Sequence, residues 1–509
     1  MGSRLERLKA RVLADFASCR GSRLTDPDEG AALARLVARE YGRSAGAPEV
    51  ERKASFLAAF AGEMPIRLRP DELILGSQRF MAPPWEAILG AATVQAMQWR
   101  GNLGHIVVDY GRVLHRGLAG LGREIAAMRT TDAVSRRNQL AFARSVEALS
   151  CFIGRHGEAA AAAGDARLSQ ICAWVRERPP CTFHQALQLT WFVHLFLHAE
   201  SPGTAAISFG RLDQYLWPFL RRDLEEGILD LAQARELLAC FWLKCCEGDE
   251  SQNLVVGGCD GEGQPAENPL SLLCLEVCGS LRLWQPSLSV RLGPGSPEGF
   301  RRAAFNLCLQ GFGMPSFLND PVIIRALQAV GIPLSRARDY GIVGCYEATP
   351  QGDTTPYTVA GRILLPQLVR EYVDVAQADT YEAFENGFAR FLTERYLETI
   401  LPGFEQSWAQ RARDCASPFE SVCVTGCLDS GRCAEEGGAR FSLYGVNILG
   451  LGTAVDSLQA VRDLVYRERA LTLRELRQTL ASDFADGTAS VAVGLAPIGE
   501  DVEIGRAHV

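Results

Sequence analysis

The stretch DYGIVGCYEAT, residues 339–349, decides how the rest of the sequence is interpreted. Residues 340–343 form a short apolar run, which predicts a strand that ends at Gly344. In an extended segment, side chains two residues apart face the same side, so we expect the Cys345 thiol and the Glu347 carboxylate to share one space. The stretch therefore predicts a thiol beside a base. The alternative is a structural role, with a buried cysteine next to an exposed glutamate, and this is the more common outcome for an isolated cysteine.

The chain around this stretch has the composition of a large globular protein. It has 509 residues, a formal net charge of −8, 47% hydrophobic and 22% charged residues, which excludes a disordered or fibrous chain. No basic block, bilayer-length apolar run or signal peptide occurs, so neither nucleic acid nor membrane is a predicted partner. The 16 cysteines are then expected to be reduced thiols. These features predict a cytoplasmic protein with a small-molecule partner.

Helical periodicity alternates along the chain with short strand-like pieces. Capping boxes open several of the helical stretches. The strand-like pieces lie before glycine or proline, at residues 287–292, 340–343 and 443–449. Such alternation predicts an α/β fold.

A succession of motifs resembles the glycyl radical enzymes, the pyruvate formate-lyase-like family. The resemblance extends over nearly the whole chain and follows the family in order and approximate spacing. The motifs are PDELILG (70–76), GH (104–105) with DY (109–110), FHQALQ (183–188), GRLDQY (210–215), QPSLSVR (285–291), GMP (313–315) with ND (319–320), GCYE (344–347) and AVDSL (454–458).

The resemblance implies a ten-stranded α/β barrel surrounded by helices, here over residues 1–502. In this family a radical stored on a backbone glycine moves to a cysteine on a loop inside the barrel, and that cysteine takes a hydrogen atom from the substrate. Cys345 matches this cysteine, and Glu347 matches the base of the eliminating members. The resemblance also implies a homodimer, no bound cofactor other than the glycyl radical, and an activating enzyme that uses S-adenosylmethionine and an Fe–S cluster to install it.

The sequence around the cysteine narrows the reaction class. Pyruvate formate-lyase itself has two adjacent cysteines at this loop, whereas Gly344 precedes Cys345 here. We therefore expect a dehydratase, or a lyase that breaks a C–O, C–N or C–S bond of a small hydroxylated substrate. The alternatives are C–C cleavage of the formate acetyltransferase type and a catalytically silent barrel scaffold. Tyr346 and Ala348 depart from the residues usual at these places and leave the substrate open.

Three further residues are candidates for substrate contacts. His105 and Asp109 are polar groups in an apolar run and could hold a hydroxyl, although a buried structural hydrogen bond is an equally good interpretation. Thr358 follows Cys345 by thirteen residues and is expected either to face the pocket or to lie on the surface.

Two patterns raise the question of a metal site. His194 and His198 have the spacing of zinc ligands on a helix, but no general base lies between them and no third ligand is evident. Cys423, Cys427 and Cys433 match neither a zinc ribbon nor an Fe–S pattern. We therefore predict that the chain has no metal site and that the two histidines are part of the core.

The C-terminal end predicts a truncated gene product. No Arg-Val-x-Gly-Tyr loop, which would carry the family's radical glycine, occurs in the sequence. The last seven residues, EIGRAHV (503–509), are the translation of the start of a widely used sequencing adapter. We expect residues 503–509 to be a foreign tail. The barrel is then expected to be incomplete at its C-terminus and inactive without a glycine domain.

Overall fold

The computed structural model describes residues 3–18, 25–81, 83–97, 104–202, 206–248, 251–355, 361–443 and 445–483. The chain forms two compact units, which are treated separately below. The first consists of residues 1–358 and 410–443, and the second of residues 359–409 and 444–509. Within the described ranges, no helix combines the length and the apolarity needed to cross a bilayer.

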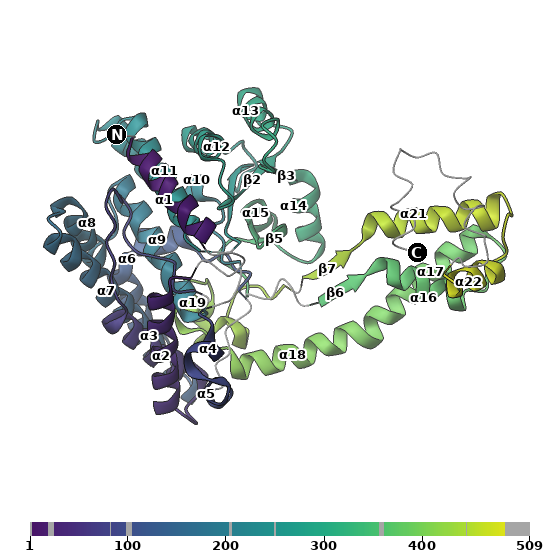
Figure 1. Cartoon of the computed structure of the whole chain (residues 1–509), viewed down its shortest axis with the longest axis horizontal. Coiled ribbons are helices and arrows are strands. Elements are labelled where there is room, and N and C mark those ends of the chain that lie inside the picture. The colour runs from purple at the N-terminus through teal and green to yellow at the C-terminus, as the bar shows by residue number, and fades with distance from the viewer. Residues whose placement is uncertain are drawn as a thin grey trace. The chain divides into compact units, whose positions relative to one another are not determined.

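Most of the first unit is helical (Figure 1). The helices before its first strand are α1 (Arg4–Ser18), α2 (Pro27–Arg43), α3 (Glu49–Glu63), α4 (Trp85–Leu89), α5 (Ala91–Met97), α6 (Tyr110–Ala126), α7 (Ala133–Ala162), α8 (Ala166–Glu177), α9 (Phe183–Glu200), α10 (Leu212–Glu225) and α11 (Leu231–Cys245). Those after it are α12 (Pro269–Leu281), α13 (Glu298–Cys308), α14 (Asp320–Ala329), α15 (Leu334–Arg338), α19 (Pro418–Val422), α20 (Cys427–Ser430) and the 3₁₀ turn η2 (Ala434–Glu436).

Helix α9 is the central helix of this unit. Its sequence is apolar on nearly all sides, and a helix of that kind has to be buried. Nearly all of its residues are indeed buried, and a capping box between Thr182 and Gln185 begins it. The main hydrophobic core forms around it, with contributions from α3, α7, α11 and α12.

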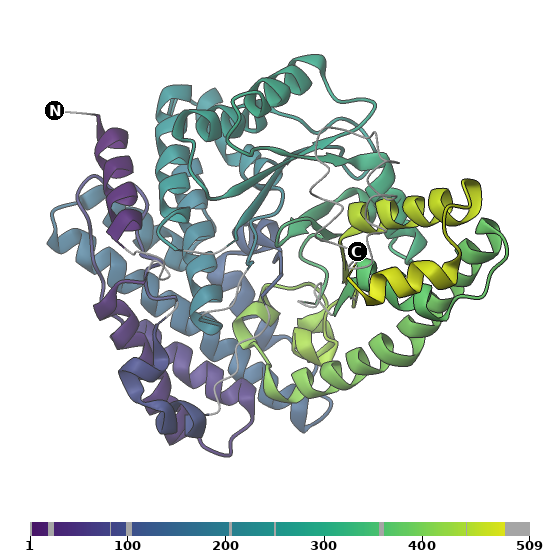
Figure 2. The ribbon, with the colours of Figure 1, turned by 45° about the vertical axis from the view of Figure 1, so that its right-hand side comes forward.

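A parallel sheet of three strands lies in the first unit. Strand β2 (Ser287–Leu292) lies between β1 (Asn253–Gly257) and β3 (Ser316–Asn319), and both pairings are parallel. Isolated parallel bridges extend the same order beyond β1, from Leu254 to Gly210 and from Ile207 to Ile106. Figure 2 shows these teal strands beside the teal helices of the unit. Every residue of β1 is buried, as expected for a parallel strand covered on both faces.

A β-hairpin follows α15 and carries the cysteine singled out above. Strand β4 (Tyr340–Val343) pairs antiparallel with β5 (Glu347–Pro350), and residues 344–346 form the turn. The prediction of a strand over residues 340–343 is confirmed. The prediction that Cys345 and Glu347 share one extended segment is wrong, because the chain reverses between them.

The second unit is built on its own small sheet and core. Strand β6 (Gly361–Leu364) pairs in parallel with β7 (Val446–Leu449). Its helices are α16 (Leu365–Val375), α17 (Tyr381–Arg395), α21 (Leu451–Val461) and α22 (Leu473–Ala481), with π-helical turns η1 (Tyr396–Ile400) and η3 (Arg462–Arg467). Helix α18 (Leu401–Asp414) begins in this unit and ends in the first. In the second unit, the aromatic part of the core consists of Tyr372, Phe384 and Phe388.

The α/β class predicted from the sequence is confirmed. The strand predicted at residues 287–292 is β2, and that predicted at 443–449 contains β7. The assignment of residues 1–502 to one barrel domain stays a prediction. The expected foreign tail, residues 503–509, lies outside the described residues.

Candidate active site

The hairpin turn places the Glu347 carboxylate against the backbone of Cys345. Cys345 is an exposed free cysteine in the turn, and Glu347 is the first residue of β5, where it pairs with Val343. The Glu347 carboxylate folds back over the turn. Its Oε2 accepts hydrogen bonds from the backbone N–H groups of Cys345 at 3.0 Å and Tyr346 at 3.1 Å. A turn, and not an extended strand, thus places the Glu347 carboxylate at the backbone of Cys345. That the thiol and the carboxylate share one space stays a prediction.

The turn requires glycine at position 344. Gly344 has φ +61°, in the left-handed region that favours glycine. A Cβ atom there would lie 2.7 Å from Glu347 Oε2 and 2.8 Å from His105 Cδ2, closer than side-chain atoms approach one another. The space left by the missing side chain is thus bordered by both the Glu347 carboxylate and the His105 imidazole. His105, far away in the sequence, therefore lies next to the turn that carries Cys345 and Glu347.

His105 adopts an uncommon backbone conformation. Its φ is +53°, and it follows Gly104 with φ +60°. A non-glycine residue with positive φ carries a cost of about 1–3 kcal/mol, and such residues concentrate at functional sites. These two residues directly precede Ile106, whose bridge to Ile207 begins the parallel sheet. His105 therefore brings its imidazole to the hairpin turn from the position just before the Ile106 bridge.

A buried ion pair anchors the base of the hairpin. Arg291, from β2, donates from Nε to Oδ1 and from Nη2 to Oδ2 of Asp320, both at 2.8 Å. The same guanidinium donates to the carbonyl of Tyr340 at 3.0 Å and lies 3.9 Å from the centre of its ring. The Tyr340 hydroxyl in turn donates to Asp320 Oδ1 at 2.7 Å. The first residue of β4 is therefore held at both its backbone and its side chain.

Burial and charge oppose each other in this network. Burial alone would lower the pKa of Arg291, but the hydrogen bonds and the charge of Asp320 raise it. Burial also raises the pKa of the Tyr340 phenol. In the sequence, Arg291 and Asp320 belong to two separate motifs, and nothing in the motifs connects the two residues. An arginine within an apolar strand was the signal that could have indicated a buried partner.

Asp109 has a structural task in this molecule. Its Oδ1 accepts the N–H of Arg112 at 2.8 Å and so caps α6, and its Oδ2 accepts the Thr425 hydroxyl at 3.4 Å. Burial raises the pKa of Asp109, and the bond from Arg112 opposes that rise. Of the two interpretations left open by the sequence, these contacts favour the buried structural hydrogen bond. Thr358 lies outside the described residues.

The two histidines of α9 form a buried polar chain. His194 Nδ1 lies 3.0 Å from the Tyr110 hydroxyl, its Nε2 lies 2.8 Å from Gln252 Oε1, and His198 Nε2 lies 3.1 Å from His194 Nε2. Burial lowers the pKa of His194 to about 3, so the ring is neutral. Among the residues that the structure describes, histidine, cysteine and carboxylate side chains nowhere gather in a group that could hold a metal ion.

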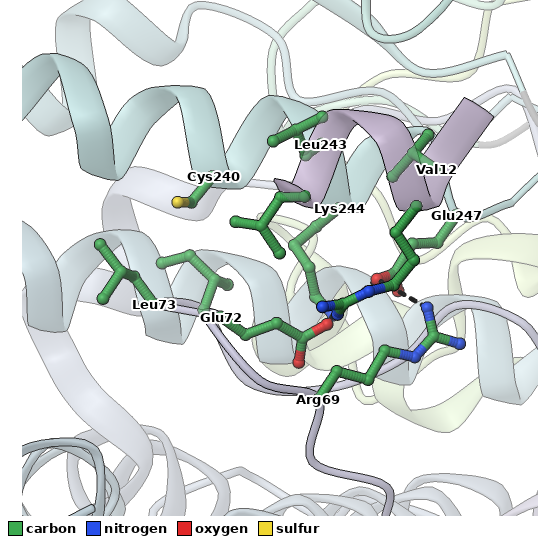
Figure 3. Close-up of a pocket in the computed structure, with 11 residues that line it drawn as sticks. Val12, Arg69, Glu72, Leu73, Cys240, Leu243, Lys244 and Glu247 are labelled. Atoms are coloured by element: carbon green, nitrogen blue, oxygen red, sulfur yellow. Dashed lines mark hydrogen bonds and ion pairs between the residues drawn. The ribbon is translucent and has the colours of Figure 1, made fainter. Parts of the chain in front are cut away.

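A second buried ionic cluster occupies a different part of the first unit. Lys244 donates to Glu72 at 3.0 Å and to Glu247 at 2.9 Å, beside a cavity of about 10 Å³ between α1 and α11 (Figure 3). Such a cavity has room for about one water molecule. Cys345, Glu347 and His105 do not line it. Arg69 links this cluster to α1, because it pairs with both Glu247 and Asp15. We interpret the cluster as a structural ion network that attaches α1 to the core.

Comparison with known proteins identifies the family. A family model described as "Pyruvate formate lyase-like" matches residues 79–490. The chain belongs to the pyruvate formate lyase-like family, and the resemblance seen in the motifs is confirmed.

Relatives and solved structures agree with this assignment. The chain is 30% identical over 443 residues to "Probable dehydratase YbiW" of Escherichia coli strain K12, covering 75% of this chain and 54% of that protein. It is also 30% identical to an isethionate sulfite-lyase of Nitratidesulfovibrio vulgaris, over 74% of this chain and 52% of the relative. The chain thus spans about half the length of these curated relatives. A glycyl radical enzyme from Archaeoglobus fulgidus shares the fold, with a TM-score of 0.87, 22% identity, and coverage of 97% of this chain and 76% of that one. The predicted fold class is confirmed.

Proposed function

We propose that this chain carries the cysteine and the base of a radical dehydratase or lyase. The observation that carries the proposal is the hairpin turn, in which the Glu347 carboxylate lies against the backbone of Cys345 and beside the His105 ring. The printed functions of the curated relatives, a probable dehydratase and a sulfite-lyase, support the same reaction class. The substrate class is a small molecule with a hydroxyl group next to a carbon that bears a leaving group.

Each side chain has one step in the proposed reaction. The Cys345 thiyl takes a hydrogen atom from the carbon that bears the hydroxyl, which regenerates the thiol and leaves a carbon radical. Glu347 then takes the hydroxyl proton, and the neighbouring leaving group departs with the electron pair of its bond. The resulting product radical takes the hydrogen atom back from Cys345. His105 is proposed to hold the substrate hydroxyl toward Glu347, and Asp109 and Thr358 stay candidates for substrate contacts.

The oxidising equivalent comes from outside the described site. A glycyl radical supplies it by accepting the thiol hydrogen atom, and the exposure of Cys345 at the tip of the turn fits that demand. We propose that this glycine is provided beyond the 509 residues and that an activating enzyme with S-adenosylmethionine and an Fe–S cluster installs the radical. A homodimer is the proposed assembly. Residues 1–502 are proposed to form the barrel part, and 503–509 a foreign tail.

The turn geometry favours elimination over the two-cysteine chemistry. A cysteine at position 344 would place its Cβ against both Glu347 and His105. Formate acetyltransferase activity of that type is therefore the less favoured alternative.

Replacement of the cysteine tests the proposal. Cys345→Ser, in protein supplied with a glycine-bearing segment and its activating enzyme, is expected to abolish turnover while the glycyl radical signal in electron paramagnetic resonance persists. The reason is that a hydroxyl does not serve as the hydrogen-atom abstractor. Cys308→Ser, at another exposed cysteine, is the matched control. Turnover by Cys345→Ser would refute the assignment.

A further inference from the structure

The two oxygens of the Glu347 carboxylate have different surroundings. Oε2 accepts the N–H groups of Cys345 and Tyr346. Among the described residues, no hydrogen-bond donor contacts Oε1. One oxygen is thus committed to the backbone of the turn, and the other is available to a substrate.

The turn has few other contacts that could hold it. Cys345 and Tyr346 are both exposed, the latter by 56%, so their side chains add little packing. The Ser251 hydroxyl donates to the carbonyl of Gly344 at the long distance of 3.4 Å. The Glu347 carboxylate supplies the only two hydrogen bonds to the N–H groups of Cys345 and Tyr346 within the described part of the chain. Its position is limited in turn by Gly344, since a Cβ atom there would meet Oε2.

We propose that Glu347 is also the positioning residue for Cys345: Oε2 braces the turn that presents the sulfur, and Gly344 leaves the space that the brace needs. The meaning of this brace for catalysis rests on the proposed function, in which Cys345 is the reacting thiol. The brace itself is a property of the folded chain. One carboxylate then performs two tasks. Its Oε2 holds the backbone of Cys345, and its Oε1 is left to accept the substrate proton.

Amide hydrogen exchange measures the brace without turnover. Peptides spanning residues 340–350 are followed by mass spectrometry in the wild type, Glu347→Ala and Glu347→Gln. Both variants remove the charge, but only glutamine keeps a carbonyl oxygen that can accept the two N–H groups. We expect Glu347→Ala to speed exchange of the Cys345 and Tyr346 amides by about tenfold or more, and Glu347→Gln to stay within about threefold of the wild type.

A matched control and a second variant keep the outcome decisive. Asp26 Oδ1 also accepts two backbone N–H groups, those of Asp28 and Glu29, so Asp26→Ala removes a similar pair of bonds at the start of α2 and should leave the 340–350 peptides unchanged. Gly344→Ala should displace the intact Glu347 and speed exchange as Glu347→Ala does.

The results separate the brace from the proposed function. Equal exchange in wild type and Glu347→Ala, or equal loss of protection in the alanine and glutamine variants, would overturn the brace. Loss of turnover in Glu347→Gln with protection retained would support both tasks. Turnover by Cys345→Ser would refute the proposed function and leave the exchange result standing.

Discussion

Replacing Asp320 with asparagine should loosen the hairpin that carries Cys345. The Arg291 and Asp320 side chains are 0% and 4% exposed, so Asp320→Asn leaves a buried guanidinium without its counter-charge. Breaking a buried ion pair on one side costs about 3–5 kcal/mol, and the remaining amide oxygen places this case at the lower end. Tyr340→Phe removes only the hydroxyl bond to Asp320, which costs about 1.5 kcal/mol for a charged acceptor. Since about 1.4 kcal/mol corresponds to a factor of ten, the opening equilibria of the hairpin in the two variants should differ by roughly a factor of ten.

Hydrogen exchange in β4 is the suitable assay because a chain with two compact units is not expected to unfold in one step. The amides of residues 341–343 should exchange about 10²-fold faster in Asp320→Asn and about tenfold faster in Tyr340→Phe. The control is Glu298→Gln, which breaks an exposed arginine–carboxylate pair with Arg302. It should change amide exchange in β4 by about threefold at most. Exchange in β4 that is as slow in Asp320→Asn as in Glu298→Gln would refute the reasoning.

Further expectations concern the base, a helix cap and the response to pH. Glu347→Gln should retain hydrogen exchange between substrate and enzyme but slow product formation by about 10² to 10⁴, because the general base is lost; product formed at the wild-type rate would contradict this. Asp109→Ala removes the cap that accepts the N–H of Arg112 and should destabilise α6 by about 1 kcal/mol, whereas Asp109→Asn should cost much less; amide exchange in α6 would show equal effects if the cap were unimportant. Burial raises the pKa of Glu200 to about 7 despite Lys53 and two backbone N–H groups. Because this pKa lies above the ordinary value of 4.5, the associated stability is present at acidic pH and is lost as the pH rises through about 7. Glu200→Gln should therefore show a smaller fall in the melting temperature of the first unit, which contains Glu200, between pH 6 and 8 than the wild type does. Equal falls would contradict the raised pKa of Glu200.

Local sequence patterns predicted the elements on which the site is built. The apolar run 340–343 became β4, and the run 287–292 became β2, because short β-branched or apolar runs between turn residues have few other ways to be buried. The pairing of Cys345 with Glu347 was also predicted, but from an extended geometry that does not occur. A three-residue turn depends on the left-handed conformation of Gly344 and on the pairing of β5 with β4, and neither follows from spacing alone.

Contacts between distant segments were beyond the reach of sequence patterns. His105 was a candidate, yet its approach to Gly344 depends on two successive positive φ angles and on the edge of the parallel sheet. Arg291 and Asp320 appeared in separate motifs, and only the packing of β2 against the start of α14 shows that they form one ion pair. The sequence left Asp109 open between a substrate contact and a structural hydrogen bond, because a helix cap and a binding residue require the same buried carboxylate.

The burial of the hairpin changes along its length in a way that suits the reactive thiol proposed for Cys345. All four residues of β4 are buried, Gly344 is buried, and Cys345 is exposed. The base of the hairpin is attached to Asp320 through the side chain of Tyr340, whereas the tip is held by Glu347, a residue of the hairpin itself. In the proposed reaction the Cys345 thiol exchanges hydrogen atoms with two different partners, and this needs an unobstructed sulfur on a backbone that does not move. A rigid strand that ends in a braced turn meets both requirements, whereas a position within the paired strands would have enclosed the sulfur among cross-strand neighbours.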